Sequence, residues 1–351
     1  MIIKKVALKN FRNHLDTTVS LSPGINILIG DNAQGKTNLL EAIYLTCIGR
    51  GWRSRLDKEL INFDKDFSTV KTSIQKAYGN IDVEIRLSRD KKKSVSINKI
   101  PIAKMGELLG TVNCIFFSPD ELRLIKEAPS DRRKFMDIDI SQIDKNYFYE
   151  LLKYNKTLAQ RNALLKAKPS EVERSLDIWD EQLVKSGGLL IQRRLQFVAA
   201  LKKHLQQIHS RMSDDKERID IEYEHCPDMA KQLAENRIRD LSLGNTSVGP
   251  HRDDLLITLN GKDVRKYASQ GQQRSAALSL KLCQLQTFKD ITNEAPIVLF
   301  DDVFSELDDK RQSNLLQLLS ETQAILTTTH KPDNCAAQLF NVQNGQIDIG
   351  Q

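Results

Sequence analysis

Alternating hydrophobic and polar residues predict strands over much of the first third of the chain. These strands cover residues 2–8, 18–21, 25–29, 69–75, 80–87, 94–97 and 111–117. The run Arg89-Asp90-Lys91-Lys92-Lys93 separates two of them. We expect a basic hairpin tip there, and an ordinary solvated turn fits these residues equally well.

Apolar residues recur at helical spacing between residues 119 and 215, with little β-branched alternation. We expect three or four helices here, the longest of about 30–40 residues, which is too short for a long coiled coil. A strand at 218–223 and a helix at 228–240 return the chain to an α/β pattern. The last third alternates strand and helix, with elements at 254–259, 269–288, 296–300, 308–319 and 324–328 and a hairpin signal at 343–346.

Strands joined by helices indicate parallel pairing, so the predicted fold class is α/β. Two strand-rich parts separated by a helical stretch indicate one domain that carries an insertion. We therefore expect residues 1–118 and 241–351 to form the two halves of one domain. Residues 119–240 are expected to form an inserted, mainly helical lobe.

The first chemical motif follows the strand at 25–29. Gly30 to Thr37 reads G-x-x-x-x-G-K-T, and an amphipathic helix is expected to begin near Lys36. Phosphates need closely spaced backbone N–H donors, which glycine leaves accessible and a helix N-terminus supplements with partial positive charge. Lys36 is expected to reach the β- and γ-phosphates, and the Thr37 hydroxyl to bind Mg²⁺. The motif predicts a nucleoside-triphosphate site.

Two adjacent carboxylates supply a second part of such a site. The apolar strand at 296–300 ends in Asp301 and Asp302. In P-loop folds a strand of this kind lies beside the P-loop strand, so Asp301 is expected to hold Mg²⁺ near Thr37. Asp302 can orient or deprotonate the attacking water.

The helix at 269–288 begins with Ser269-Gln270-Gly271-Gln272, and a serine and a glycine amide at a helix N-terminus form another anion site. One chain does not need two such sites, so we expect this helix to cap the nucleotide held by a second copy. A capped helix with nothing bound is the alternative, because serine is a common N-cap. Three further runs favour the second copy, at 117–119, at 305–308 and at 327–330, where His330 is expected near a γ-phosphate.

Two other runs resemble functional clusters. His251, Asp253 and Asp254 could be mistaken for metal ligands, but alternate residues of an extended chain face opposite sides, so we expect a structural role. The run Arg132-Arg133-Lys134 either contacts DNA phosphates or caps a helix and pairs with Asp131 and Asp137. The residues alone leave both possibilities open.

Composition indicates the cellular setting. Five scattered cysteines without C-x-x-C spacing indicate a reducing cytoplasm and argue against a zinc site or disulfides. No apolar run reaches the roughly 20 residues of a membrane span, and no signal-peptide layout is seen. The net charge is +6, and residues 1–120 hold 19 Lys and Arg against 12 Asp and Glu. This excess suits a nucleic-acid partner, and it is also common on proteins without one.

Several motifs, taken in order, resemble the SMC-like group of ABC-type ATPases in DNA repair: G-D-N-A-Q-G-K-T, S-Q-G-Q-Q-R, I-V-L-F-D-D and S-E-L-D. The runs at 8–14, 118–120, 129–137 and 248–254 resemble the RecF family within that group. The lack of a long coiled coil and of a C-x-x-C hook fits this family. The resemblance implies an ABC-type P-loop ATPase head with a mixed sheet and an inserted helical lobe.

The resemblance also implies roles for individual residues. ATP would be held by Gly30, Asp31, Asn32, Ala33, Gln34, Gly35, Lys36 and Thr37, with Arg12 and Asn13 near the base and sugar. Mg²⁺ would be held by Thr37 and Asp301, and the reacting phosphate and water by Lys36, Asp302 and His330. The ATP of a second subunit would be reached by Ser269, Gly271 and Gln272, with Asp308 at the seam.

The sequence departs from the usual ABC pattern at two places. Asp302 stands where most ABC ATPases have a glutamate, and its shorter reach predicts slow hydrolysis. Tyr267-Ala268 precedes the signature helix in place of a leucine. We therefore expect a weak, DNA-stimulated ATPase that acts mainly as a switch.

The function implied by the resemblance is that of an ATP-dependent homodimer that binds duplex or gapped DNA in the cytoplasm. It would act with RecO and RecR to load RecA on single strands covered by SSB, in gap repair and replication restart. The alternative is the nucleotide-binding subunit of a membrane ABC transporter, against which the helical insertion and the basic N-terminal part argue. An SMC-like nuclease partner would need a long coiled coil or an acidic nuclease module.

Overall fold

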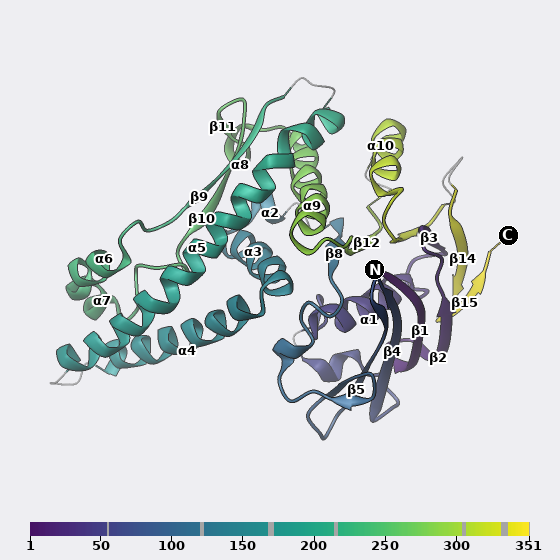
Figure 1. Cartoon of the computed structure of the whole chain (residues 1–351), viewed down its shortest axis with the longest axis horizontal. Coiled ribbons are helices and arrows are strands. Elements are labelled where there is room, and N and C mark those ends of the chain that lie inside the picture. Colours follow the sequence, from purple (N-terminus) through teal and green to yellow (C-terminus); the bar gives the residue numbers. More distant parts are fainter. Residues whose placement is uncertain are drawn as a thin grey trace. The chain divides into compact units, whose positions relative to one another are not determined.

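The computed structural model describes residues 1–54, 56–119, 123–167, 172–213, 217–303, 307–330 and 336–350 of the chain. The backbone forms two compact units, Met1–Glu121 with Gln284–Gln351, and Leu122–Cys283. The first unit carries two six-stranded sheets, and the second carries the long helices and a three-stranded sheet (Figure 1).

One layer of the first unit is an antiparallel sheet with the strand order β2-β1-β4-β5-β6-β7. Its strands are β1 (Ile2–Phe11), β2 (His14–Ser20), β4 (Phe67–Lys76), β5 (Gly79–Ser88), β6 (Ser94–Ile97) and β7 (Ile100–Pro101). Alternate residues such as Val6, Leu8 and Val70 are buried. One face of this sheet therefore packs on the core while the other faces solvent.

The second layer is a mixed sheet with the order β15-β14-β3-β13-β12-β8. Its strands are β3 (Ile25–Ile29), β8 (Cys114–Phe117), β12 (Ile297–Asp301), β13 (Ala324–Thr328), β14 (Gln338–Gln343) and β15 (Gln346–Ile349). All neighbouring pairs are parallel except β14 with β15. Because the carboxyl ends of parallel strands meet at one edge, the residues that follow β3, β12 and β13 lie close together.

Helix α1 (Lys36–Ile48) contacts strands of both sheets. The sequence predicted an amphipathic helix, but its apolar residues are buried on nearly all sides: Leu39, Leu40, Ala42, Ile43, Tyr44, Leu45 and Cys47. A helix that is apolar all round needs cover on every side, which two sheets supply. The other helical segments of this unit are α10 (Asp309–Leu319) and the 3₁₀ turns η1 (Asp57–Leu60) and η2 (Met105–Glu107).

The second unit is mainly helical. Its helices are α2 (Arg123–Lys126), α3 (Pro129–Ile143), α4 (Lys145–Ala167), α5 (Val172–Ser213), α6 (Met229–Glu235), α7 (Arg237–Leu243) and α8 (Val264–Tyr267). Helices α4 and α5 pack against each other (Figure 1), and α5 has 42 residues, slightly more than predicted. No helix in the part of the chain that the structure describes is long and apolar enough to cross a membrane.

A three-stranded antiparallel sheet completes this unit, with the order β11-β10-β9. Its strands are β9 (Ile219–Glu224), β10 (Asp254–Leu259) and β11 (Lys262–Asp263). The sequence placed the end of the inserted lobe at residue 240, but this unit continues to Cys283 because β10 pairs with β9. Helix α9 (Gln270–Thr292) begins in it and runs on into the first unit.

Two buried arginines connect the helices of the second unit. Arg161 on α4 donates to Asp180 on α5 at 2.6 Å and to Asp240 on α7 at 2.8 Å. Arg194 on α5 donates to Asp137 on α3 at 2.8 Å. Both guanidinium groups are at most 2% exposed. Removing one partner of such a pair leaves an uncompensated buried charge, at a cost of about 3–5 kcal/mol.

The run before β10 is bound into the same unit. Tyr154 of α4 meets His251 Nδ1 at 2.7 Å, and Arg132 of α3 pairs with Asp254 at 2.6 Å. Arg133 donates to the backbone oxygen of Asp253 at 2.7 Å. Both arginines thus bind the run at 253–254, and the charge of Asp137 also raises the pKa of Arg133 against the effect of burial.

A metal role for the same run finds no support. Within the described ranges, no group of three or more His, Cys, Asp and Glu side chains is arranged to hold a metal ion. His251 and Asp254 instead bind different helices, α4 and α3, as the predicted structural role requires.

Candidate nucleotide site

The loop between β3 and α1 depends on its two glycines. A Cβ atom on Gly30 would overlap the carbonyl oxygen of Val342 in the adjacent strand β14. Gly35 has a φ of +115°, and a Cβ there would lie 2.8 Å from the Asn13 side chain. Neither position accepts a larger residue, and the loop backbone between them passes from strand to helix unobstructed.

Lys36 is almost buried beneath this loop. Its ammonium group donates to the backbone oxygens of Gly30 and Asp31, the latter at 2.9 Å. Burial lowers the pKa of Lys36, and the charges of Asp302, Asp301 and Asp31 oppose that shift. A lysine so placed supplies a positive charge at the mouth of the loop, where a phosphate would sit.

Asp301 ends β12 and lies beside the loop. Its Oδ1 accepts from the Thr37 hydroxyl at 2.5 Å and from the Thr327 hydroxyl at 3.1 Å, and its Oδ2 pairs with Arg53 at 2.8 Å. Mg²⁺ prefers a few protein oxygen ligands and completes its shell with water and substrate phosphates. The Thr37 hydroxyl and the Asp301 carboxylate fit that ion.

The next acid and the expected histidine lie at the same edge of the mixed sheet. Asp302 has a φ of +55°, and its backbone N–H donates to the Thr327 hydroxyl at 2.9 Å. His330 follows β13, is exposed, and its N–H donates to the Thr328 hydroxyl at 3.2 Å. The P-loop, both carboxylates and His330 thus lie at the ends of strands that meet at one edge of this sheet. Which of them acts on a phosphate stays a prediction.

Asn13 and Arg12 make hydrogen bonds that support the loop and the start of α1. Asn13 donates to the backbone oxygen of Gln34 at 3.0 Å and accepts from Asn38 at 2.8 Å. Arg12 donates to Glu41 at 2.9 Å and to the Ser54 hydroxyl at 2.6 Å. Of the other loop residues, Asp31, Asn32 and Ala33 are exposed.

The sequence missed three residues of this region: His14, Glu41 and Arg53. His14 is fully buried and lies 3.1 Å from the oxygen of Gly35 and 2.7 Å from that of Gly345. It joins the P-loop to the β14–β15 turn, whose Gly345 N–H also bonds to Gln34. Burial lowers the pKa of His14, and the hydrogen bonds to the two backbone oxygens oppose that shift.

The second predicted anion site begins α9, in the other unit. Ser269 and Gln272 cap this helix reciprocally: the Ser269 N–H donates to Gln272 Oε1 at 2.8 Å, and the Gln272 N–H donates to Ser269 Oγ at 3.3 Å. A Cβ atom on Gly271 would meet nothing within 4 Å. Of the run at 305–308, Ser305 and Glu306 lie outside the described residues, and Asp308 caps α10.

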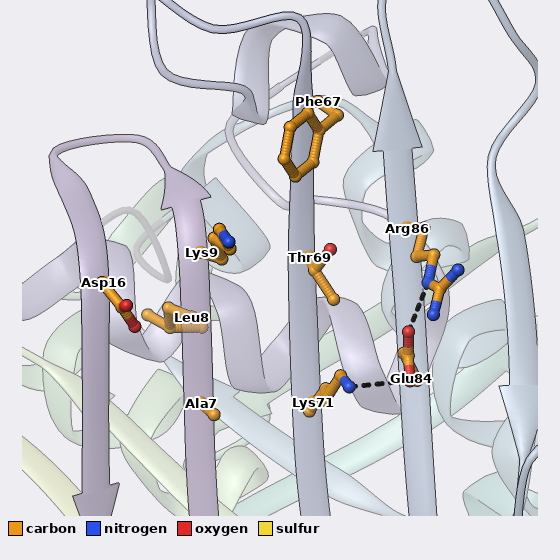
Figure 2. Close-up of a pocket in the computed structure, with 9 residues that line it drawn as sticks. All are labelled: Ala7, Leu8, Lys9, Asp16, Phe67, Thr69, Lys71, Glu84 and Arg86. Carbon is orange, nitrogen blue, oxygen red and sulfur yellow. Dashed lines mark hydrogen bonds and ion pairs between the residues drawn. The ribbon is translucent and has the colours of Figure 1, made fainter.

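A separate hollow of about 350 Å³ lies on the solvent face of the antiparallel sheet (Figure 2). It is lined by Ala7, Leu8, Lys9, Asp16, Phe67, Thr69, Lys71, Glu84 and Arg86. Glu84 pairs with both Lys71 and Arg86, so two of the three cations share one negative charge. None of the residues predicted to bind nucleotide lines this hollow. The P-loop edge stays the candidate site.

The two-sheet fold and the residues of the P-loop edge define a class of proteins, the ATPase heads of the SMC-like ABC group. The family model described as "RecF/RecN/SMC N terminal domain" matches residues 2–346. The chain is 43% identical over 360 residues to the DNA replication and repair protein RecF of Agathobacter rectalis, covering 99% of both. It is 42% identical to that of Alkaliphilus oremlandii, covering 99% of this chain and 100% of the relative. The chain belongs to the RecF family.

Solved structures agree with this assignment. A structure described as the recombination mediator protein RecF with ATP superposes with a TM-score of 0.93 at 37% identity, covering 99% of this chain and 97% of the other. An SMC head bound to a domain of ScpA has a TM-score of 0.62 at 17% identity and shares the fold. The predicted fold class and family resemblance are confirmed.

Proposed function

We propose that this chain is an ATP-switched DNA-binding protein of recombinational repair. The P-loop edge of one copy holds Mg²⁺–ATP, and the start of α9 in a second copy closes over the same nucleotide. Hydrolysis, slow because Asp302 has a short reach to water, reopens the pair. ATP thus serves mainly to join two subunits.

The observation that carries the nucleotide part is the meeting of Thr37 and Asp301 at 2.5 Å beside the buried Lys36. These three groups come from the two ends of the chain. Together they offer an oxygen pair for Mg²⁺ and a cation for phosphate. The bound metal would neutralise phosphate charge, while Gly30 to Thr37 would hold the triphosphate through backbone N–H groups.

The pairing of two copies is supported by Gly271. Glycine in a helix costs about 1 kcal/mol relative to alanine. Among the described residues of this unit, none requires a glycine here, since a Cβ would meet no atom within 4 Å. A group that approaches from outside would explain it, and the N–H groups of a helix start suit a phosphate.

DNA is the proposed partner, in duplex or gapped form. The relatives are DNA replication and repair proteins, and one is described as a mediator in the RecFOR pathway. We propose the same setting for this chain, with RecO and RecR as partners in loading RecA on strands covered by SSB. A transporter subunit finds no support among these full-length relatives.

The test of this proposal is Asp302→Asn. Amide in place of carboxylate cannot take a proton from water, so the variant should remain a dimer in ATP, seen as a doubled mass in light scattering. The wild type should be dimeric in a non-hydrolysable ATP analogue and monomeric in ADP. A variant that stays monomeric in ATP would refute the switch.

A further inference from the structure

We propose that Glu217 and His209 are positioning residues for the start of α9, and through it for the nucleotide of a second copy. The inference rests on the proposed function, which assigns Ser269, Gly271 and Gln272 to that nucleotide. Glu217 lies just before β9 and His209 in the last turns of α5. Neither belongs to a motif that the sequence revealed.

The side chain of Gln272 has two ends with different partners. Its Oε1 accepts from the Ser269 N–H at 2.8 Å, which completes the cap of α9. Its Nε2 donates to Glu217 Oε1 at 2.9 Å. A carboxylate accepts hydrogen bonds and donates none, so Glu217 decides which end of the amide faces the helix.

Glu217 is itself held from the other side. Its Oε2 lies 3.0 Å from His209 Nε2, and His209 Nδ1 lies 2.9 Å from the hydroxyl of Ser279. Ser279 stands two turns further along the same helix α9. The connection therefore leaves α9 at Gln272, passes through Glu217 and His209, and returns to α9 at Ser279.

The histidine is bound through both ring nitrogens. His209 is fully buried, and burial lowers its pKa while Glu217 opposes the shift. Nε2 faces the Glu217 carboxylate, which only accepts, so Nε2 donates to it. Nδ1 faces the Ser279 hydroxyl, whose own proton goes to the backbone oxygen of Ser275 at 2.7 Å. The imidazole is therefore fixed between Glu217 and Ser279.

This arrangement prepares Ser269 for a phosphate. Its oxygen accepts from the Gln272 N–H at 3.3 Å, which leaves its own O–H able to donate to a phosphate. Without Glu217 the amide of Gln272 can rotate by half a turn, placing a donor against the Ser269 N–H. The cap would be lost, and the hydroxyl and the Gly271 N–H would no longer be held in a fixed direction.

The decisive variant is Glu217→Ala. The P-loop lies in the other unit of the chain, so fluorescent ADP should bind the variant within about twofold of wild type. Dimerisation in a non-hydrolysable ATP analogue, measured by light scattering over a range of protein concentrations, should weaken by about tenfold or more, the worth of one charge-assisted hydrogen bond. Glu217→Gln keeps the shape of the side chain and one acceptor. Its dimerisation should be weaker than that of wild type and stronger than that of Glu217→Ala.

The matched control is Asp220→Asn. Asp220 is a β9 carboxylate whose partners belong to α5 and β9: it pairs with Lys202 at 2.7 Å and accepts from the Ile221 N–H. The Asp220→Asn variant should dimerise as wild type does.

Two results would overturn the inference. One is that Glu217→Ala dimerises as wild type does, and the other is that it loses ADP binding and dimerisation equally. If Glu217→Ala does not fold, Glu217→Gln decides between the same outcomes. A wild type that never dimerises would instead refute the proposed function.

Discussion

At the scale of single residues, three buried histidines make the fold sensitive to acid. Burial lowers the pKa of His14, His209 and His251, that of His251 to about 4. In the unfolded chain each imidazole returns to its usual pKa of about 6.5. The unfolded state therefore binds protons more readily below that pH, and protonation favours unfolding.

The expected result is full stability above about pH 6.5 and a progressive loss as pH falls towards 4. His251 alone should remove about 1.4 kcal/mol of unfolding free energy per pH unit in that window. Urea unfolding at several pH values measures the slope. His251→Asn, which does not titrate, should give a shallower slope, and parallel curves for the two proteins would contradict the assignment.

Residues of the candidate site could be predicted where their chemistry is local in sequence. Gly30 to Thr37 form a continuous motif, and Asp301 follows an apolar strand that marks it. His14 could not be predicted, because its partners Gly35 and Gly345 lie 21 and 331 residues away. The local sequence of a histidine between a strand and a turn does not show which backbone carbonyls its side chain will contact.

At the scale of elements, the start of α9 combines a stable cap with an exposed glycine. The reciprocal bonds of Ser269 and Gln272 satisfy orphan N–H groups of the helix. Gly271 contributes nothing to that cap through a side chain. Helix stability and the proposed function therefore make opposite demands on the residue at position 271.

Gly271→Ala should separate these demands. The melting temperature should stay the same or rise, since alanine is better in a helix by up to about 1 kcal/mol. ATP-dependent dimerisation should be lost, because a methyl group would stand where the phosphate approaches. Calorimetry and light scattering measure the two effects. A variant that dimerises normally would show that no ligand approaches Gly271.

The tip between β5 and β6 is a second element with a testable role. Arg89 donates to the backbone oxygen of Lys65 at 2.8 Å, and Lys93 pairs with Asp57 at 3.1 Å, so both support neighbouring loops. Lys91 and Lys92 are exposed. Of the basic residues in the run at 89–93, these two are the ones left to meet solvent or phosphate.

Charge reversal distinguishes the basic tip from a solvated turn. Lys91→Glu with Lys92→Glu should weaken DNA binding and reduce the slope of log affinity against log salt by about 1 per lysine. Fluorescence anisotropy on duplex DNA measures both. Lys262→Glu, in the net acidic last third, is the control. An unchanged slope in the double variant would establish the tip as an ordinary turn.

Helices and strands were predicted well where one periodicity of apolar residues dominates. They were predicted less well where packing partners decide how an element is paired or buried. The bounds of β3, β6, β10 and β13 match the prediction. The pattern of β10 is that of any half-buried strand, so nothing in it indicated pairing with β9. Helix α1 was misjudged because five apolar positions suggested one buried face, while two sheets cover it on all sides.

At the scale of the whole molecule, the proposed dimer would use the two units of different copies to hold one nucleotide. The P-loop edge lies in the first unit and the capped start of α9 in the second. In the proposed dimer, each copy contributes one part to each of two nucleotides. Dimer formation then brings two basic N-terminal parts to the same DNA.

The salt dependence of DNA binding tests this last step. Each phosphate neutralised by a lysine or arginine releases counterions, so the slope of log affinity against log salt counts contacts. A closed pair presents twice the basic surface of one copy, and the slope on gapped duplex DNA should about double in a non-hydrolysable ATP analogue. Lys36→Arg, impaired in nucleotide use, should show the shallow slope with and without the analogue. If the wild-type slope is the same in both conditions, ATP does not bring a second copy to DNA.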